Sequence, residues 1–173
     1  MKKVDLVSIG RIIRSEGKDG TLKIRLQPEI SRESFFKKIY LEQEGELKEF
    51  EVESFRIVRN SPFLRLKGIN SLQEAEALRG REILARAEDF PALENGLYYD
   101  FQLLDCLVET TDGRKLGRVV ELITMGSTNL LVVEIAGKKV EIPLVAAICR
   151  QIDPAAKIII IDPPEGLLEL NEV

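Results

Sequence analysis

Residues suited to catalysis are few in this sequence. Histidine, the side chain used most often as a general base near neutral pH and as a metal ligand, is absent from all 173 residues. The two cysteines, Cys106 and Cys149, stand among apolar neighbours, so we expect two reduced, buried thiols and no disulfide. Two cysteines without histidine do not make an ordinary zinc site. The sequence therefore predicts no metal, no cofactor and no enzymatic activity.

A short glycine loop is the first segment that could hold a ligand. Gly17 and Gly20 lie between two segments that are rich in aliphatic residues. The loop lacks the Gly-x-Gly spacing of a dinucleotide-binding turn, and it leads into a strand instead of a helix. We interpret it as a turn in which glycine supplies backbone angles that other residues rarely adopt.

Three cations near this loop, Arg11, Arg14 and Lys18, are candidate contacts to an anionic partner. Arginine and lysine bind phosphate oxygens through charge-assisted hydrogen bonds. The alternative is that they are solvated charges at strand ends, and this interpretation fits the sequence equally well.

Two adjacent tyrosines, Tyr98 and Tyr99, stand at the start of the second half. Tyrosine suits a docking surface because it buries a large ring at low entropic cost and keeps a hydroxyl for a hydrogen bond. The alternative is packing, with one ring in a barrel core and the other sealing the segment between two domains.

Strand signals dominate the chain that must position these residues. Thr21–Leu26 alternates between apolar and polar residues, as a strand with one buried face does. Asp112-Gly113 and Asn60-Ser61-Pro62 predict turns. These patterns predict strands at Val4–Ile13, Thr21–Leu26, Lys38–Leu41, Leu47–Val58, Phe63–Leu66, Arg81–Arg86, Cys106–Thr110, Lys115–Ile123, Asn129–Ile135, Lys138–Ile142, Ile148–Ile152 and Lys157–Ile161.

One helix interrupts the strands of the first half. Ser71 is a good N-cap, and Glu74 three residues later is its capping-box partner. Leu72, Ala75 and Leu78 recur at helical spacing, and a glycine two residues later ends the helix.

The composition changes after the last strand of the first half. Residues 89–97 carry proline and glycine and have no hydrophobic period, which indicates an interdomain linker. We expect a first domain over residues 1–88 and a second over residues 98–173. The predicted fold class is all-β: two small β-barrels joined by a short linker, with one short helix in the N-terminal barrel.

The two halves differ in charge. Residues 1–90 contain 18 Lys and Arg against 16 Asp and Glu, a net charge of +2, whereas residues 91–173 contain 7 against 13, a net charge of −6. The acidic half would repel bare phosphates, so a basic protein partner suits it better. Solubility alone is the simpler explanation of the charge.

Two predicted strands, Leu130–Val133 and Ile158–Ile161, are apolar on both faces. A strand with one solvent-exposed face alternates between apolar and polar residues. A continuous apolar run therefore indicates that the outer face is covered as well. The tail at Pro163–Leu168, the other domain or a partner could provide this cover, and tail or interdomain packing is the simpler explanation.

No apolar run approaches the roughly 20 residues that a membrane-spanning helix needs. The first residues also lack the apolar stretch of a secretory signal. We therefore expect a cytoplasmic protein without a membrane partner, and a monomer as the default.

Several motifs, each weak alone, become specific through their order along the chain. Gly10-Arg11-Ile12 leads into the glycine loop, and Tyr98-Tyr99-Asp100 opens the second half. Gly113-x-x-Leu116-Gly117-x-Val119 follows, and then come Ile142-Pro143, Ile152-Asp153 and Pro164-Glu165-Gly166-Leu167. In this order, over roughly residues 7–168, the chain resembles the RimM family of ribosome maturation factors.

The resemblance implies a fold and a set of partners. RimM proteins join an N-terminal six-stranded barrel to a C-terminal PRC-barrel. They bind the free, immature small ribosomal subunit near its head and assist late folding of its ribosomal RNA. The PRC-barrel contacts a head protein, the nineteenth of the small subunit. The paired tyrosines of the family, which matter for subunit binding, correspond to Tyr98 and Tyr99.

The chain departs from the family at two positions. Where the family usually carries histidine before the first glycine of the loop, this chain has Glu16, and a carboxylate there weakens the case for phosphate contacts by the loop. With this resemblance, Arg11, Arg14 and Lys18 remain candidate contacts to RNA. Where a glycine often follows the Tyr-Tyr-Asp segment, this chain has Asp105.

Two other functional classes use similar barrels. Barrels like the first domain also occur in flavin reductases, but this chain has no cofactor loop and no outstanding pair of carboxylates. PRC-barrels also occur as membrane-associated modules of photosynthetic reaction centres, but the N-terminal barrel and the lack of a membrane segment favour the ribosomal role.

Overall fold

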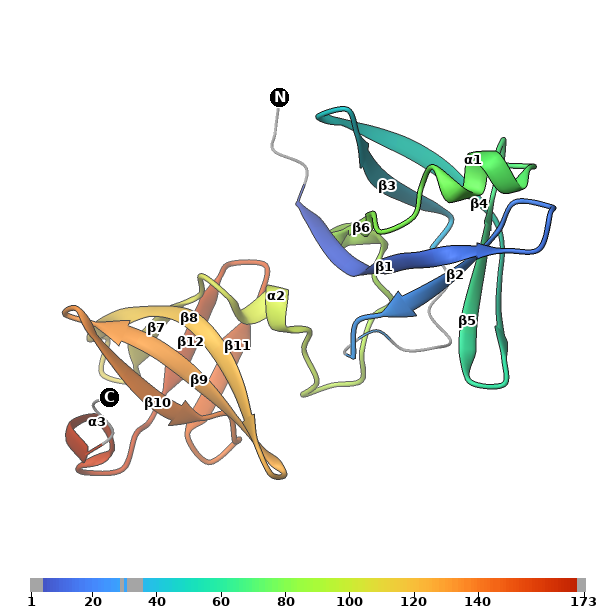
Figure 1. Cartoon of the computed structure of the whole chain (residues 1–173). Helices are drawn as coiled ribbons and strands as arrows, with labels where there is room; N and C mark the ends of the chain where they lie inside the picture. The colour runs from blue at the N-terminus through green and yellow to red at the C-terminus, as the bar shows by residue number, and fades with distance from the viewer. Residues whose placement is uncertain (1–4, 29, 31–35, 171–173) are drawn as a thin grey trace. The chain divides into compact units, whose positions relative to one another are not determined.

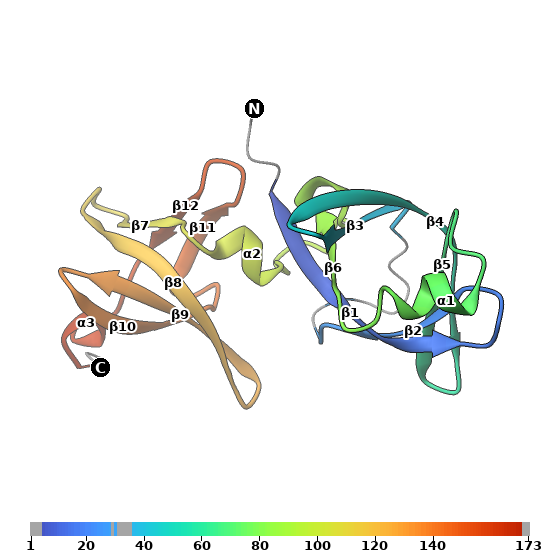
Figure 2. The same cartoon turned by 45° about the horizontal axis from the view of Figure 1, so that its top comes forward.

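The structure is a computed structural model that describes residues 5–28, 30 and 36–170 (Figure 1). The chain is built mainly from β-strands, which confirms the predicted fold class. It divides into two compact units, residues 1–92 and residues 93–173, and Figure 2 shows both from a second direction. Within the described ranges, no helix is long and apolar enough to cross a membrane.

The first unit is a closed barrel with the strand order β1-β2-β5-β4-β3-β6, and all neighbouring strands are antiparallel. Closure removes the free edges that an open sheet would present to other chains. The strands are β1 (Leu6–Glu16), β2 (Thr21–Leu26), β3 (Lys38–Gln43), β4 (Glu46–Val58), β5 (Ser61–Leu66) and β6 (Glu82–Arg86).

Strand β1 is longer than predicted, and it bends as it pairs with both β2 and β6. The predicted start at Val4 lies outside the described residues, and the strand continues past Ile13 to Glu16. Its register shifts once against β2 and once against β6, as β-bulges cause. At the bend, a Cβ on Gly10 would meet the backbone carbonyl of Arg25. The glycine of the first motif is therefore needed for close strand approach.

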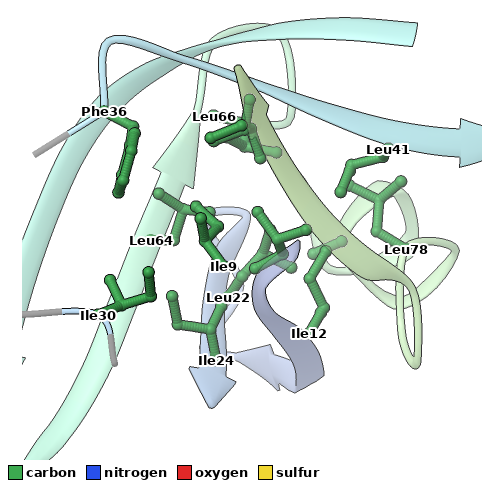
Figure 3. Close-up of a cluster of buried hydrophobic side chains, with 14 residues drawn as sticks. Ile9, Ile12, Leu22, Ile24, Ile30, Phe36, Leu41, Leu64, Leu66 and Leu78 are labelled. Carbon is green, nitrogen blue, oxygen red and sulfur yellow. The ribbon is translucent and has the colours of Figure 1, made fainter. Parts of the chain in front are cut away.

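The core of the first barrel is formed by side chains that alternate along the strands, as the periodicity predicts. Figure 3 shows aliphatic side chains from β1, β2, β3 and β5 meeting Leu78, which follows α1 (Leu72–Glu76). The buried residues of this cluster are Ile9, Ile12, Leu22, Ile24, Ile30, Phe36, Ile39, Leu41, Leu64, Leu66, Ala75, Leu78, Ile83 and Ala85.

The capping signals of α1 are confirmed. The Ser71 hydroxyl accepts from the backbone N–H of Glu74 at 3.2 Å, and the Glu74 carboxylate accepts from the backbone N–H of Ser71 at 3.0 Å. Regular helix ends at Glu76, earlier than the apolar spacing suggests. A short 3-10 turn, Ala87–Asp89, follows β6.

The turn predicted at Asn60-Ser61-Pro62 is placed too late. Strand β5 begins at Ser61, and the hairpin turn is made by Arg59 and Asn60 with φ angles of 47° and 64°. Two-residue hairpins favour positive φ at both central residues because that twist matches the twist of the strands. Pro62 therefore belongs to the strand, opposite Ile57.

The second unit is a six-stranded, barrel-like sheet in the order β10-β9-β8-β7-β12-β11. Strands β7 and β12 pair in parallel, and the other neighbours are antiparallel. The strands are β7 (Leu107–Thr110), β8 (Lys115–Met125), β9 (Thr128–Ile135), β10 (Lys138–Pro143), β11 (Cys149–Asp153) and β12 (Ile158–Ile161). Two short helices that the sequence analysis missed, α2 (Asp100–Leu103) and α3 (Leu167–Leu170), complete the unit.

The apolar run of β9 is buried on both faces, as predicted. Leu131 and Val133 belong to the core, against which Leu167 and Leu168 of the tail pack. Val132 points to the other face and is still only 3 % exposed. It stands in register between Glu121 of β8 and Glu141 of β10, and the aliphatic stems of long side chains can cover such a residue.

Both cysteines are buried and carry no disulfide, as predicted. Burial raises the pKa of the Cys106 thiol and raises that of Cys149 to about 11. Among the residues that the structure describes, no cluster of three potential metal ligands occurs.

Candidate functional site

The two tyrosines immediately precede helix α2, a single turn that side-chain hydrogen bonds stabilise at both ends. At its start, the backbone N–H of Tyr99 donates to Oε1 of Gln102 at 2.8 Å. Glutamine at the third helical position is a capping signal that the sequence analysis overlooked. The Tyr98-Tyr99 segment is thus directed by a local hydrogen bond.

Lys157 holds the other end of α2. Its Nζ donates to the carbonyl oxygens of Phe101, Gln102 and Leu104 at 3.1, 3.1 and 3.0 Å. Carbonyl groups at a helix C-terminus lack partners within the helix and attract a cation. Lys157 immediately precedes β12 and lies more than fifty positions from α2 in the chain, so no local pattern identifies it as a support of this helix.

Asp105 lies in a tight turn between α2 and β7. Its φ is 63°, a conformation that glycine adopts freely and that aspartate tolerates better than most residues. Its N–H donates to the carbonyl of Val119 at 2.9 Å, and its own carbonyl accepts from Arg118 at 2.7 Å. The departure from glycine at this position is therefore compatible with the fold.

Tyr99 is buried, with 5 % of its surface exposed. Its ring stacks on Phe101, with ring centroids 5.4 Å apart and an interplanar angle of 10°. Burial raises the pKa of the Tyr99 phenol above its ordinary value. This tyrosine offers little surface to a partner and acts as a packing residue for α2.

Tyr98 is half-buried, packs against the core of the second unit and lines a shallow surface groove of about 220 Å³. Within the described part of the chain, no hydrogen bond engages its hydroxyl. We call this hollow the Tyr98 groove; it is lined by Gly96, Leu97, Tyr98, Ser127, Thr128, Asn129, Leu144 and Val145.

Exposed apolar residues surround the Tyr98 groove. Leu97 is 59 % exposed and Val145 is 39 % exposed, and Met125, the register partner of the groove residue Thr128, is 64 % exposed. Apolar side chains gathered on a surface and edged by polar groups are typical of protein interaction sites.

Carboxylates lie on the outer face of β8, β9 and β10, close to the groove along the strands. Glu121 and Glu141 flank Val132 in one row of register partners, and the next row of the same face toward the groove is apolar: Ile123, Leu130 and Pro143. Lys139 approaches Glu121 at 3.8 Å. We call this surface, defined by these two rows, the β8–β10 face.

The three candidate RNA contacts lie in the first unit and differ in availability. Arg11 and Lys18 are exposed, and neither forms an ion pair with a residue that the structure describes. Arg14 pairs with Glu16, at 3.0 Å between the guanidinium and the carboxylate. The acidic residue that departs from the family pattern therefore competes for the charge of Arg14.

The glycine loop itself has a structural role. Gly17 and Gly20 have φ angles of 78° and 85°, as the sequence predicts. Asp19 between them accepts from the backbone of Thr21 at 3.2 Å and from Arg65 at 2.8 Å. Its hydrogen bonds with Thr21, and then the charge of Arg65, lower the pKa of Asp19.

Two family models match the two units of this architecture. Residues 7–90 match the RimM N-terminal domain and residues 100–167 match the RimM PRC barrel domain. The chain is 34% identical over 168 residues to the ribosome maturation factor RimM of Geobacter metallireducens, covering 96% of this chain and 97% of that one. It is 31% identical over 159 residues to the same factor of Thermotoga maritima, covering 89% of each. A solved structure, a 16S ribosomal RNA processing protein RimM from Pseudomonas aeruginosa, is 25% identical, with a TM-score of 0.47, over 92% of this chain and 98% of that one.

Proposed function

Because the chain belongs to the RimM family of ribosome maturation factors, we propose that it binds the free, immature small ribosomal subunit and assists late folding or processing of its RNA. The observation that carries the proposal is the match of both family domains, in the family's order, along one chain. The proposed action is binding, without a catalytic step. A factor of this kind stabilises the state of the subunit that it binds best, in proportion to its difference in affinity between states.

The second unit is the proposed contact to a protein of the subunit head, the nineteenth of the small subunit. Three properties support it: the exposed apolar rim of the Tyr98 groove, the carboxylates of the β8–β10 face, and the net charge of −6 over residues 91–173. Ribosomal proteins are basic, so opposite charge would favour and orient their encounter with this unit. The apolar rim would then supply most of the affinity.

The two tyrosines have different proposed roles. Tyr98 contacts the partner directly, because its ring lines the groove and its hydroxyl is available there. Tyr99 acts by positioning α2, because it is buried and stacked on Phe101. Arg11 and Lys18 are proposed contacts to ribosomal RNA, with Arg14 weaker because of Glu16.

We further propose that the protein acts in the cytoplasm as a monomer. Residues 1–88 and 98–173 would be its two binding modules, and residues 89–97 the linker between them. A linker allows both modules to engage one particle, which raises the overall affinity through effective concentration.

Co-sedimentation of the purified protein with separated ribosomal particles tests the proposal. Wild type is compared with Tyr98→Ala, Leu97→Ala and the matched control Leu47→Ala, which shortens a leucine that is 53 % exposed in the first unit. We expect wild type to pellet with immature small subunits. The two groove variants should bind at least about tenfold more weakly, as truncation of an interface residue that contributes over 1.4 kcal/mol does, and the control should bind as wild type.

Circular dichroism of each variant establishes that it is folded. The proposal is wrong if wild type shows no preference for immature over mature small subunits. The assignment of the Tyr98 groove is wrong if the groove variants and Leu47→Ala pellet equally well.

A further inference from the structure

A row of side chains crosses four strands on one face of the first barrel. Its members are register partners on neighbouring strands: Arg14 of β1 with Lys23 of β2, Lys23 with Phe63 of β5, and Phe63 with Arg56 of β4. Such partners project from the same face of a sheet about 5 Å apart. The row therefore spans about 14 Å, and one aromatic ring stands within a line of three cations. We call it the cation–aromatic row.

The row faces away from the core. Leu22, Ile24 and Leu64, which alternate with its members along β2 and β5, point into the barrel (Figure 3). Lys23 and Phe63 are half-buried, and the arginines at both ends of the row are exposed. Part of Phe63 is therefore exposed on the outer face.

A pair of arginines next to the cation–aromatic row extends the positively charged surface. Arg11 stands opposite Arg25 on β1 and β2, and both are exposed. Like charges placed directly opposite each other destabilise a sheet unless an anion lies between them. Arg11 also has a carboxylate as its register partner on β6, Glu82, but the two form no ion pair within the described ranges.

Most of these cations have no carboxylate partner. Arg14 pairs with Glu16, but Lys23, Arg25 and Arg56 form no ion pair with any residue that the structure describes. Arg65, two positions beyond Phe63 on β5, contrasts with them because Asp19 and Glu53 bind it at 2.8 and 3.1 Å. The charge is therefore neutralised at Arg65, beside the row, and left available at Lys23 and Arg56 within it.

We propose that the cation–aromatic row binds a single-stranded segment of RNA, with phosphates held by Lys23, Arg56 and the Arg11–Arg25 pair and a base stacked on Phe63. Cations interleaved with an aromatic ring on a small barrel match what a splayed-out nucleotide strand needs: charge for the backbone and a flat apolar surface for a base. An acidic protein would use the cations without requiring the ring. A surface hollow bordered by Lys23, Arg25 and Pro62 lies beside the row and offers space for the adjoining nucleotide.

The inference deepens the proposed function and rests on it only in naming ribosomal RNA as the natural ligand. It assigns RNA contact to Lys23, Arg25, Arg56 and Phe63, none of which is prominent in the sequence. These residues come from three strands and converge through register alone.

The test measures fluorescence anisotropy of a short labelled single-stranded RNA of mixed sequence with the full-length protein, over a series of salt concentrations. A blunt RNA duplex of the same length and polyglutamate serve as competitors. The variants are Lys23→Gln, Arg56→Gln, Phe63→Leu and Phe63→Tyr. The matched control is Lys48→Gln, which removes an exposed lysine from β4 outside the row, and circular dichroism establishes that each variant is folded.

We expect wild type to bind the single strand better than the duplex. Lys23→Gln and Arg56→Gln should each reduce the slope of log K against log salt concentration by about 0.7, the value for one phosphate contact in a single strand. Phe63→Leu should weaken binding about fivefold or more at unchanged slope, since it removes base stacking, and Phe63→Tyr should restore binding. Lys48→Gln should change neither quantity.

Three results would overturn the inference: no binding of the single strand by wild type, an equal loss of affinity in Lys48→Gln, or a loss confined to the charge variants with polyglutamate competing as well as RNA. The last result would identify a docking site for acidic proteins. Co-sedimentation separates this inference from the proposed function. A protein that binds the single strand but no small subunit refutes the proposed function alone, and one that binds small subunits but no single strand refutes the inference alone.

Discussion

Replacement of Lys157 by methionine tests how α2 and the tyrosines before it are held. Methionine keeps an aliphatic stem but removes the ammonium group that donates to three carbonyl groups at the end of α2. A hydrogen bond to a charged group contributes about 1.5–3 kcal/mol. The three bonds share one charge at a partly exposed position, so their contributions do not add, and we expect Lys157→Met to destabilise α2 by about 2–4 kcal/mol.

Amide hydrogen exchange of the full-length protein is the assay. The N–H of Gln102 donates to the carbonyl of Tyr99, and that of Leu104 donates to Asp100, so exchange at these two amides reports the opening of α2. A loss of 2–4 kcal/mol corresponds to exchange that is faster by about 30- to 900-fold. If the proposed function is right, binding to small subunits should weaken in parallel, although both tyrosines are retained.

The matched control is Lys139→Met, the same substitution of a lysine in the same unit. Lys139 lies 3.8 Å from Glu121 with both side chains more than half exposed, and such pairs contribute less than about 1 kcal/mol. The reasoning is refuted if the α2 amides of Lys157→Met exchange at the wild-type rate, or if Lys139→Met accelerates them as much.

Three further predictions concern the stability of the two units. Gly20→Ala should destabilise the first barrel by about 2–4 kcal/mol, because φ is 85° and the added Cβ would meet a backbone carbonyl. Gly45→Ala, at φ 80° in open space, should destabilise it by only about 1 kcal/mol in the same thermal melts. Equal losses of stability in the two variants would contradict this account. Hydrogen bonds, first from Lys38, lower the pKa of Glu49 below its ordinary 4.5. The contribution of Glu49 to stability is therefore present above pH 4.5 and is lost as pH falls through the folded pKa. The difference in melting temperature between wild type and Glu49→Gln should shrink over that range, and a constant difference would exclude the ion pair as its cause. Burial, which raises the pKa of Cys149 to about 11, should block its alkylation by iodoacetamide at pH 8 until urea unfolds the protein, as mass spectrometry would show; rapid labelling of the folded protein would contradict it.

Local features were predicted well because their chemistry lies within a few residues. The capping box of Ser71 and Glu74 needs only a spacing of three, and the structure confirms it. The loop alone predicted that Gly17 and Gly20 adopt backbone angles rare for other residues, and both have positive φ. Alternation along β2 predicted a strand with one buried face, and Leu22 and Ile24 on that face lie in the core.

Local reasoning was less successful where two signals compete. Pro62 suggested a turn because proline often occurs in turns, but here it lies in the strand after a two-residue turn. Helix α2 was missed because four residues are too few for an apolar period to emerge, and its remaining cues were Asp100 in the first turn and the capping residue Gln102.

The candidate site was predicted only in part. The family pattern singled out Tyr98 and Tyr99 as a pair. Their environments differ, since Tyr98 lines a groove and Tyr99 is buried, and the sequence of two adjacent tyrosines does not predict this difference. The support by Lys157 depends on the turn that leads into β12, a strand that pairs in parallel with β7.

By itself, the sequence determined the strand periodicity, the buried cysteines, the capped helix and the order of motifs that marks the family, because each depends on residue types at short spacing. Only the tertiary structure decided which outward residues become neighbours. Lys23 and Phe63 are forty positions apart in the chain, and Phe63 and Arg56 belong to opposite strands of a hairpin, yet barrel closure and register place them in one row. Register depends on how all six strands bury their apolar faces together, and no local segment carries that information.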